Sequence, residues 1–94
     1  MNQRISNLRN KMKAQNLKAV LINNLKNVYY LTNFWGSNGT ALVTEERVVL
    51  FTDSRYTIHA HATCFPFVEI VETRDELTAA AEIVKDLGIK ELGF

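Results

Sequence analysis

The stretch that decides the fold is residues 40–52, TALVTEERVVLFT. Two runs rich in β-branched residues, 40–44 and 47–52, are separated only by Glu45 and Glu46. Such runs favour strands, and a connection this short joins antiparallel neighbours. The pattern predicts a β-hairpin, although Glu-Glu is not a strong turn signal and leaves the turn type open.

Upstream of the hairpin, helical patterns alternate with a strand. Residues 3–15 space apolar side chains at helical intervals with basic residues between them, which is typical of an amphipathic helix. Asn16 tolerates the left-handed backbone conformation in which helices often end, and residues 17–22 favour a buried strand. Residues 25–34 then predict a short helix before the turn at 34–40.

Downstream of the hairpin, the same alternation continues. Asp53 stands where a side chain would cap a helix over residues 54–63, and residues 67–72, FVEIVE, favour a strand after it. Helices interleaved with strands are typical of an α/β domain, and the hairpin makes its sheet mixed. We therefore expect a single domain with three layers, α/β/α, around a mixed sheet of about five strands.

The C-terminal part carries a further helix signal. Thr73 and Glu76 form a capping-box signature, apolar residues follow at helical spacing, and Gly88 suits the end of that helix. Residues 90–94, KELGF, then begin a strand without a polar tail or a terminating turn. We expect the sequence to be a piece of a longer protein, truncated at its C-terminal end.

The composition is that of an ordinary soluble globular domain. A net charge of +1 without clustered Lys and Arg disfavours nucleic-acid binding. No apolar run reaches the roughly 20 residues that span a bilayer, so we expect no membrane association. The single cysteine, Cys64, allows no internal disulfide, which agrees with a cytoplasmic location.

The residues that could carry chemistry do not form a recognisable active site. His59 and His61 would point in different directions on a helix, so a metal site with Cys64 is disfavoured against surface or half-buried side chains. Ser54 has no adjacent base to activate it. Arg55 leaves two alternatives open, because a guanidinium here either pairs locally or holds a carboxylate. We expect no catalytic residue and no metal ligand in this chain.

The turn at residues 34–40, FWGSNGT, places the only tryptophan of the chain beside glycine, serine and asparagine. These small residues favour a turn, so the aromatic side chains there are either anchors or a contact surface. A phosphate-binding loop would need a lysine after the last glycine and a helix to follow, whereas Thr40 begins a strand. A nucleotide site is therefore disfavoured.

Three stretches follow one another along the chain: residues 27–34, NVYYLTNF, residues 36–44, GSNGTALVT, and residues 50–56, LFTDSRY. Together they resemble the N-terminal domain of the creatinase, prolidase and aminopeptidase P family. That family has Asn-x-x-Tyr-Leu-Thr-Gly-Phe, a glycine loop with a following strand, and Leu-Phe-Thr-Asp-x-Arg-Tyr at these places. Asn33 stands where the family usually has glycine, and Asn can adopt the same left-handed conformation. The resemblance covers essentially the whole chain and is most like bacterial Xaa-Pro aminopeptidases or Xaa-Pro dipeptidases.

The resemblance implies the creatinase/prolidase N-terminal fold, with a ribonuclease H-like motif, and a non-catalytic role for residues 1–94. In such proteins a C-terminal pita-bread domain, absent from this chain, holds two divalent metal ions (Mn, Co or Zn) that activate water. The parent protein would be a metal-dependent hydrolase, a proline-specific aminopeptidase or dipeptidase that acts on proline-containing peptides. Its partners would be its own catalytic domain and the second subunit of a homodimer.

The resemblance also implies which residues contact a partner, because the family's N-terminal domain helps to build the dimer and lays a loop over the active site of the neighbouring subunit. For Phe34 and Trp35 the alternative is a ring that anchors the turn inside the domain. A stand-alone protein-interaction module, or the same domain of a creatinase-like or inactive homologue, is the alternative function. The matching residues for a substrate-pocket rim or dimer contact are Phe34, Trp35, Ser37 and Asn38, with Arg55 and Tyr56 as further candidates from the third stretch.

Overall fold

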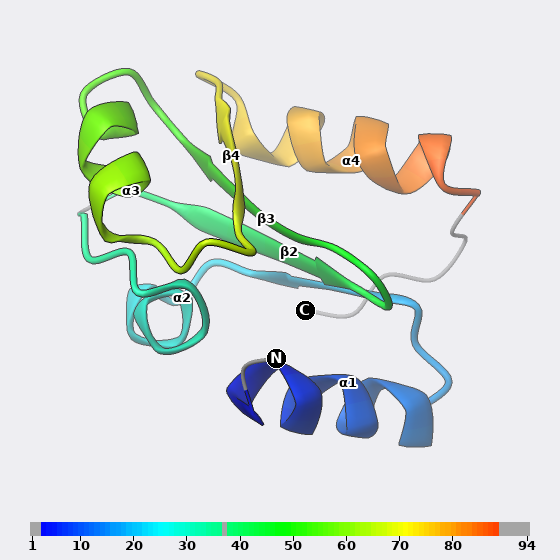
Figure 1. Ribbon diagram of the computed structural model, residues 1–94. Coiled ribbons are helices and arrows are strands. Elements are labelled where there is room, and N and C mark those ends of the chain that lie inside the picture. The colour runs from blue at the N-terminus through cyan, green and yellow to red at the C-terminus, as the bar shows by residue number, and fades with distance from the viewer. Residues whose placement is uncertain (1–2, 37, 89–94) are drawn as a thin grey trace.

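The computed structural model describes residues 3–36 and 38–88 (Figure 1). Within these residues, helices and strands alternate along the chain in the predicted order. No helix among them is long and apolar enough to cross a membrane. The elements are α1 (Gln3–Ala14), β1 (Ala19–Ile22), α2 (Leu25–Thr32), β2 (Thr40–Thr44), β3 (Val48–Thr52), α3 (Thr57–Thr63), β4 (Glu69–Glu72) and α4 (Glu76–Asp86).

The strands form one mixed sheet in the order β1-β2-β3-β4. β1 and β2 are antiparallel, β2 and β3 form the antiparallel hairpin predicted at residues 40–52, and β4 joins β3 in parallel. The predicted α/β class and mixed sheet are confirmed. The described residues contribute four strands against the expected five, and residues 90–94, where a further strand was predicted, lie outside them.

The turn between β2 and β3 is held by the hydroxyl group of Thr44. Its Oγ1 accepts hydrogen bonds from the backbone N–H of Glu46 at 3.4 Å and of Arg47 at 2.9 Å. The backbone N–H of Thr44 also donates to the carbonyl of Arg47 at 2.9 Å. A threonine hydroxyl therefore stabilises a hairpin that lacks the usual glycine or asparagine of a two-residue turn.

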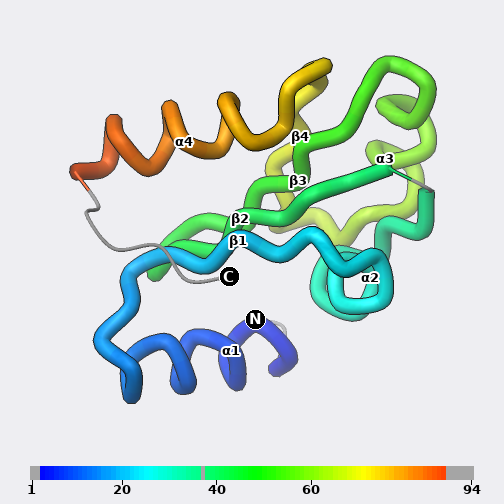
Figure 2. The backbone as a smooth tube through the Cα atoms, turned by 180° about the vertical axis from the view of Figure 1, so that it is seen from behind, coloured from blue at the N-terminus to red at the C-terminus, as the bar shows by residue number. Residues whose placement is uncertain are grey.

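Successive side chains of each strand point to opposite faces of the sheet and build two separate apolar cores. α1, α2 and α3 cover one face and α4 covers the other, as the view from behind shows (Figure 2). The predicted three-layer arrangement is confirmed. The first core includes Val20, Ala41, Val43, Val48 and Leu50 of the sheet, and the second includes Ala19, Leu21, Leu42, Val49 and Phe51.

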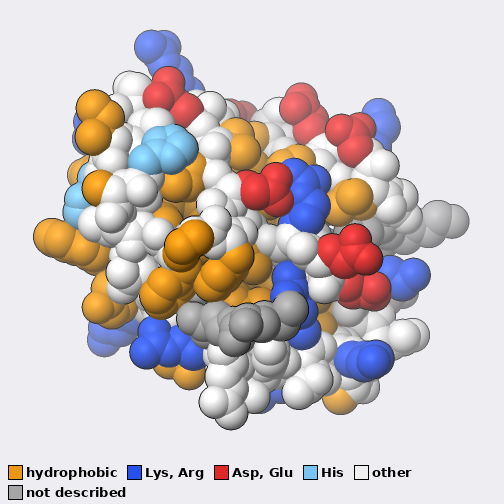
Figure 3. Space-filling model, viewed as in Figure 1, with side chains coloured by type: hydrophobic (Ala, Val, Ile, Leu, Met, Phe, Trp, Pro, Cys, Tyr) orange, Lys and Arg blue, Asp and Glu red, His pale blue; other side chains and the backbone are white. Residues whose placement is uncertain are grey.

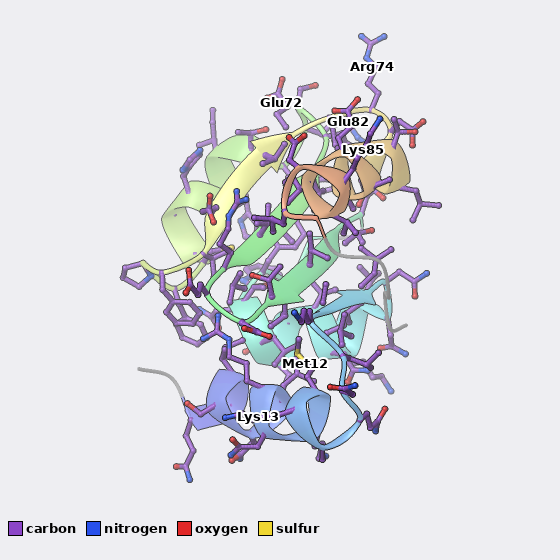
Figure 4. All side chains as sticks on the ribbon, turned by 90° about the vertical axis from the view of Figure 1, so that its right-hand side faces the viewer. Met12, Lys13, Glu72, Arg74, Glu82 and Lys85 are labelled. Carbon is purple, nitrogen blue, oxygen red and sulfur yellow. The ribbon has the colours of Figure 1, made fainter. Side chains whose placement is uncertain are left out.

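The surface mixes charges of both signs with a localised apolar region. In the face shown in Figure 3, Asp, Glu, Lys and Arg side chains are interspersed on the α4 side, whereas hydrophobic side chains gather toward α3. Figure 4 shows Met12 pointing from α1 toward the sheet, while Arg74, Glu82 and Lys85 extend outward near α4. Met12 accordingly belongs to the first core.

Asparagine residues determine several helix ends. The Oδ1 atom of Asn24 accepts hydrogen bonds from the backbone N–H of Lys26 at 3.0 Å and of Asn27 at 3.3 Å, which caps the start of α2. Asn33 ends α2 with a φ of 68°, and Asn16 follows α1 with a φ of 60°. Both residues adopt the left-handed conformation expected from the sequence, and Asn33 does so where the family usually has glycine.

The predicted cap of α3 is wrong. α3 begins at Thr57, and its N-cap residue, Tyr56, makes no side-chain cap hydrogen bond. Residues 53–56 instead form a turn in which the backbone N–H of Tyr56 donates to the carbonyl of Asp53 at 3.1 Å. The carboxylate of Asp53 stabilises this turn by accepting from the backbone N–H of Arg55 at 3.0 Å, because an aspartate side chain readily reaches the backbone two residues on.

The capping box predicted for α4 is also wrong. The N-cap residue is Asp75, whose Oδ1 accepts from the backbone N–H of Thr78 at 3.1 Å. The hydroxyl of Thr73 accepts from the backbone N–H of Asp75 at 3.1 Å, so it orders the approach to the helix. Glu76 is the first helical residue, where a carboxylate is favoured by the helix dipole.

Candidate functional site

The candidate site is the segment of residues 34–39 that joins α2 to β2, which we call the aromatic loop. Phe34 opens the aromatic loop and is 1% exposed. Its ring meets the ring of Tyr56 edge-on at 6.1 Å between centroids and the ring of His59 at 5.8 Å. Phe34 is therefore an anchor in the core of this domain. Ser37, a predicted site residue, lies outside the described residues.

Two glycines of the aromatic loop make room for the ring of Phe34. A Cβ atom added at Gly39 would lie 2.7 Å from Cε2 of Phe34, and one added at Gly36 would meet Cζ of the same ring even more closely. Neither glycine has a positive φ angle. The glycines are therefore required by close packing against Phe34 and not by a left-handed turn.

Trp35 projects from the domain next to the buried Phe34. It is 65% exposed, and its ring packs edge-on against the ring of His59 at 4.7 Å between centroids, with an interplanar angle of 86°. The Nε2 atom of His59 is buried and has no hydrogen-bond partner among the described residues, so the contact is one of ring packing. The ring of His59 thus packs against the indole of Trp35 and leaves most of the indole surface exposed.

The far end of the aromatic loop is fixed by hydrogen bonds to the end of β3. The side-chain amide of Asn38 donates from Nδ2 to Oδ2 of Asp53 at 2.8 Å. The hydroxyl of Thr52 donates to the backbone carbonyl of Asn38 at 2.7 Å. Thr52 is fully buried and Asn38 is half-buried, so the second bond is partly shielded from water. The loop is therefore held at Phe34 and at Asn38, on either side of Trp35.

Arg55 pairs with the same carboxylate. Its Nη2 donates to Oδ2 of Asp53 at 2.8 Å and its Nε donates to Oδ1 at 3.1 Å. Arg55 first and Asn38 second hold the pKa of Asp53 well below its usual value, because both stabilise the charged form. The guanidinium also lies 5.2 Å from the ring centroid of Tyr56. Arg55 thus makes a local ion pair with Asp53, one of the two alternatives open from the sequence.

The predicted site residues that the structure describes lie in one region, around the start of α3. Buried Phe34 packs against the half-buried rings of Tyr56 and His59, and Trp35 packs against His59. The side chains of Asn38 and Arg55 both bind Asp53. Figure 3 shows histidine and hydrophobic side chains side by side at the surface near α3. Sequence reasoning missed the contact of His59 with Trp35, because the two residues are 24 positions apart and carry no local signal for it.

Ile58 is a second residue that the sequence did not single out. It is 86% exposed and lies on α3 between Thr57 and His59, the residue that contacts Trp35. Packing of α3 against the core does not explain an isoleucine at position 58, because this side chain faces solvent. Ile58 therefore adds an exposed apolar side chain to the surface of α3.

Of the possible metal ligands and nucleophiles, His59 packs against the rings of the aromatic loop, and the described residues bring no metal site together. Among residues 3–36 and 38–88, no three His, Cys, Asp or Glu side chains lie close enough to hold a metal ion. Burial raises the pKa of the Cys64 thiol to about 11, so it is a neutral packing group near neutral pH. His61 is exposed and His59 half-buried, as the sequence interpretation had it.

Comparisons with known proteins give the family of the chain. Residues 4–94 match the family model described as the creatinase/prolidase N-terminal domain. Over 92 residues the chain is 36% identical to the uncharacterized peptidase YqhT of Bacillus subtilis. The aligned residues make up 97% of this chain and 26% of that protein. The chain thus spans about a quarter of the length of this curated relative.

Solved structures give the same result for the fold. An Xaa-Pro aminopeptidase of Streptococcus pyogenes is 42% identical, with a TM-score of 0.92 over 98% of this chain and 70% of that one. The N-terminal domain of the cytoplasmic peptidase PepQ from Mycobacterium tuberculosis is 38% identical, with a TM-score of 0.94 over 100% of this chain and 73% of that one. The resemblance inferred from residues 27–56 is confirmed, and the chain belongs to the creatinase/prolidase N-terminal domain family.

Proposed function

We propose that this chain is the non-catalytic N-terminal domain of a proline-specific Xaa-Pro peptidase, and that its aromatic loop forms a rim on the substrate pocket of the partner subunit in a homodimer. The same surface contributes to dimerisation. The parent protein acts in the cytoplasm on proline-containing peptides, as an aminopeptidase or a dipeptidase. The family and the described relatives support the peptidase part of this proposal.

The observation that best supports the proposed rim is the exposure of Trp35 on a loop whose two ends are fixed. An indole that is 65% exposed offers a large apolar surface to another molecule. Phe34 and Asn38 hold the aromatic loop on both sides of it. A contact group that is already ordered loses little conformational entropy when it binds, and tryptophan is enriched among the residues that dominate binding energy.

The hydrolysis itself belongs to a catalytic domain outside this chain. A pair of divalent metal ions, Mn, Co or Zn, supplies activated water in the chemistry that we propose for the parent. The described residues of this chain do not fit such a centre, because they bring no three suitable ligands together. The carboxylate of Asp53 is occupied by Arg55 and Asn38. The domain's contribution is accordingly to shape the pocket and not to take part in bond cleavage.

The experiment uses the full-length protein with Trp35→Ala or Asn38→Ala. We expect the dimer to persist on light scattering, KM for an Xaa-Pro peptide to rise by about fivefold or more, and the preference for peptide length to change. Tyr29→Ala is the matched control, because Tyr29 is an aromatic residue that is 48% exposed on α2 and lies outside the aromatic loop.

Two results would argue against the proposal. If neither variant changed KM or the length preference, the aromatic loop would not form a rim. If the natural protein carried no catalytic domain, and Trp35→Ala weakened binding to a different protein, the domain would be a stand-alone interaction module.

A further inference from the structure

We infer that Asp53 is a positioning residue of the aromatic loop: it fixes the side-chain amide of Asn38 in one orientation and so sets which group the loop presents to a bound molecule. This inference rests on the proposed rim function. Asp53 lies at the end of β3, outside the loop that it controls, and its carboxylate contacts Asn38 across fifteen positions of sequence.

The carboxylate of Asp53 is fully engaged by donors. Its Oδ2 accepts from Nδ2 of Asn38 and from Nη2 of Arg55, both at 2.8 Å. Its Oδ1 accepts from Nε of Arg55 at 3.1 Å and from the backbone N–H of Arg55 at 3.0 Å. An ionised carboxylate has about four acceptor positions, so these bonds leave it little freedom to rotate. Asp53 is therefore a rigid hydrogen-bond acceptor for the side chain of Asn38.

The orientation of the Asn38 amide follows from this arrangement. An amide turned by 180° would bring its oxygen, a second acceptor, against the carboxylate, which is unfavourable. The NH₂ group is thus directed at Asp53, and Oδ1 of Asn38 points away from it. Thr52 fixes the backbone of the same residue through its carbonyl at 2.7 Å. Main chain and side chain of Asn38 are both held before any ligand arrives.

The charge balance defines the chemistry that this arrangement recognises. The side-chain oxygen of Asn38 is a neutral amide acceptor, and Arg55 balances the negative charge of the neighbouring Asp53. Such an oxygen suits a hydrogen-bond donor, the N–H or O–H group of a peptide or of the partner subunit, and not an anion. On this inference the loop makes a donor-selective contact through Asn38, whose orientation Asp53 sets.

The test exchanges the two partners. Asn38→Asp removes the donor and places two carboxylates together, whereas the double variant Asn38→Asp with Asp53→Asn restores a donor and an acceptor in reversed positions. Trp35 is the only tryptophan of the chain, so its fluorescence anisotropy reports the order of the aromatic loop directly. Asn10→Asp is the control for charge, because Asn10 is an exposed asparagine on α1.

We expect Asn38→Asp to lower the anisotropy of Trp35 in the 94-residue chain, the double variant to recover it, and Asn10→Asp to leave it unchanged. In the full-length protein, Asn38→Asp raises KM by about three- to tenfold with kcat within twofold, as the loss of one hydrogen bond predicts. The double variant reverses at least half of that rise in KM.

Two outcomes would overturn the inference: unchanged anisotropy in Asn38→Asp, or a double variant no better than the single one. A different result would refute the proposed rim function. If Trp35→Ala left KM unchanged while the anisotropy followed the exchange of residues 38 and 53, Asp53 would still position the loop, and only the rim would be refuted.

Discussion

Phe34 and Trp35 are adjacent in the chain, yet Phe34 is 1% exposed and Trp35 is 65% exposed. The ring of His59 contacts both, at 5.8 Å and 4.7 Å between centroids. One residue of α3 thus joins a buried ring to an exposed ring. The difference in burial between the two aromatic residues predicts different effects of their substitution on stability.

The first prediction concerns that division. Phe34→Ala should lower the free energy of unfolding by about 3–5 kcal/mol, because it leaves a cavity in the core. Trp35→Ala should change it by less than about 1 kcal/mol, since most of the indole is already in contact with water. Urea denaturation of the two variants measures both values. Equal losses of stability would show that Trp35 is an anchor as well.

The second prediction concerns Gly39. Gly39→Ala places a methyl group against the buried ring of Phe34, where it should cost about 1–3 kcal/mol of unfolding free energy through overpacking. Combining it with Phe34→Leu should remove part of that penalty, because the smaller side chain leaves space. Gly88→Ala is the control. An added methyl group there would meet no other atom, but the φ of 70° makes alanine strained, so Phe34→Leu should not reduce the loss of stability caused by Gly88→Ala. Additive effects of Gly39→Ala and Phe34→Leu would refute the packing explanation.

The third prediction concerns pH. Arg55 and Asn38 lower the pKa of Asp53 in the folded protein, whereas the unfolded value is about 3.9. Because the folded-state pKa is the lower one, the ionised carboxylate stabilises the fold fully above about pH 4, and this contribution falls as the pH decreases further. The stability difference between the natural protein and Asp53→Asn should therefore be constant from pH 7 to pH 5 and shrink below about pH 4.

Urea denaturation of both proteins between pH 7 and pH 2.5 checks this pH dependence. The pKa of Asp75 is also lowered, but that residue titrates in both proteins and cancels from their difference. A difference that stayed constant down to pH 2.5 would mean that the charge of Asp53 does not contribute to stability.

Much of the fold could be predicted because its signals are local. The β-branched residues of 40–52 predict the hairpin, and the opposite faces of its strands follow from alternation. Asn16 and Asn33 predict left-handed helix ends, because few other residues tolerate that conformation. These features depend on neighbours in sequence, where residue type and spacing carry the information.

The remaining features depend on contacts between distant segments. Asp53 is well placed in sequence to cap α3, but its carboxylate is held by Asn38 and Arg55 instead. The glycines at 36 and 39 look like turn residues, whereas the ring of Phe34 explains them. Neither contact could be foreseen from residue types, because both require the packed structure. The candidate site could be proposed from its aromatic residues, whereas its hydrogen bonds could not be predicted.

The most direct test of the central claim asks on which subunit the aromatic loop acts. Mixed dimers of the full-length protein would combine one subunit whose catalytic domain is inactivated with one whose catalytic domain is intact. Trp35→Ala is placed in either the active or the inactive subunit, and KM for an Xaa-Pro peptide is measured. We predict that KM rises by about fivefold or more only when Trp35→Ala lies in the inactive subunit, because that subunit supplies the rim. A KM that rose only with Trp35→Ala in the active subunit, or in neither, would contradict the account.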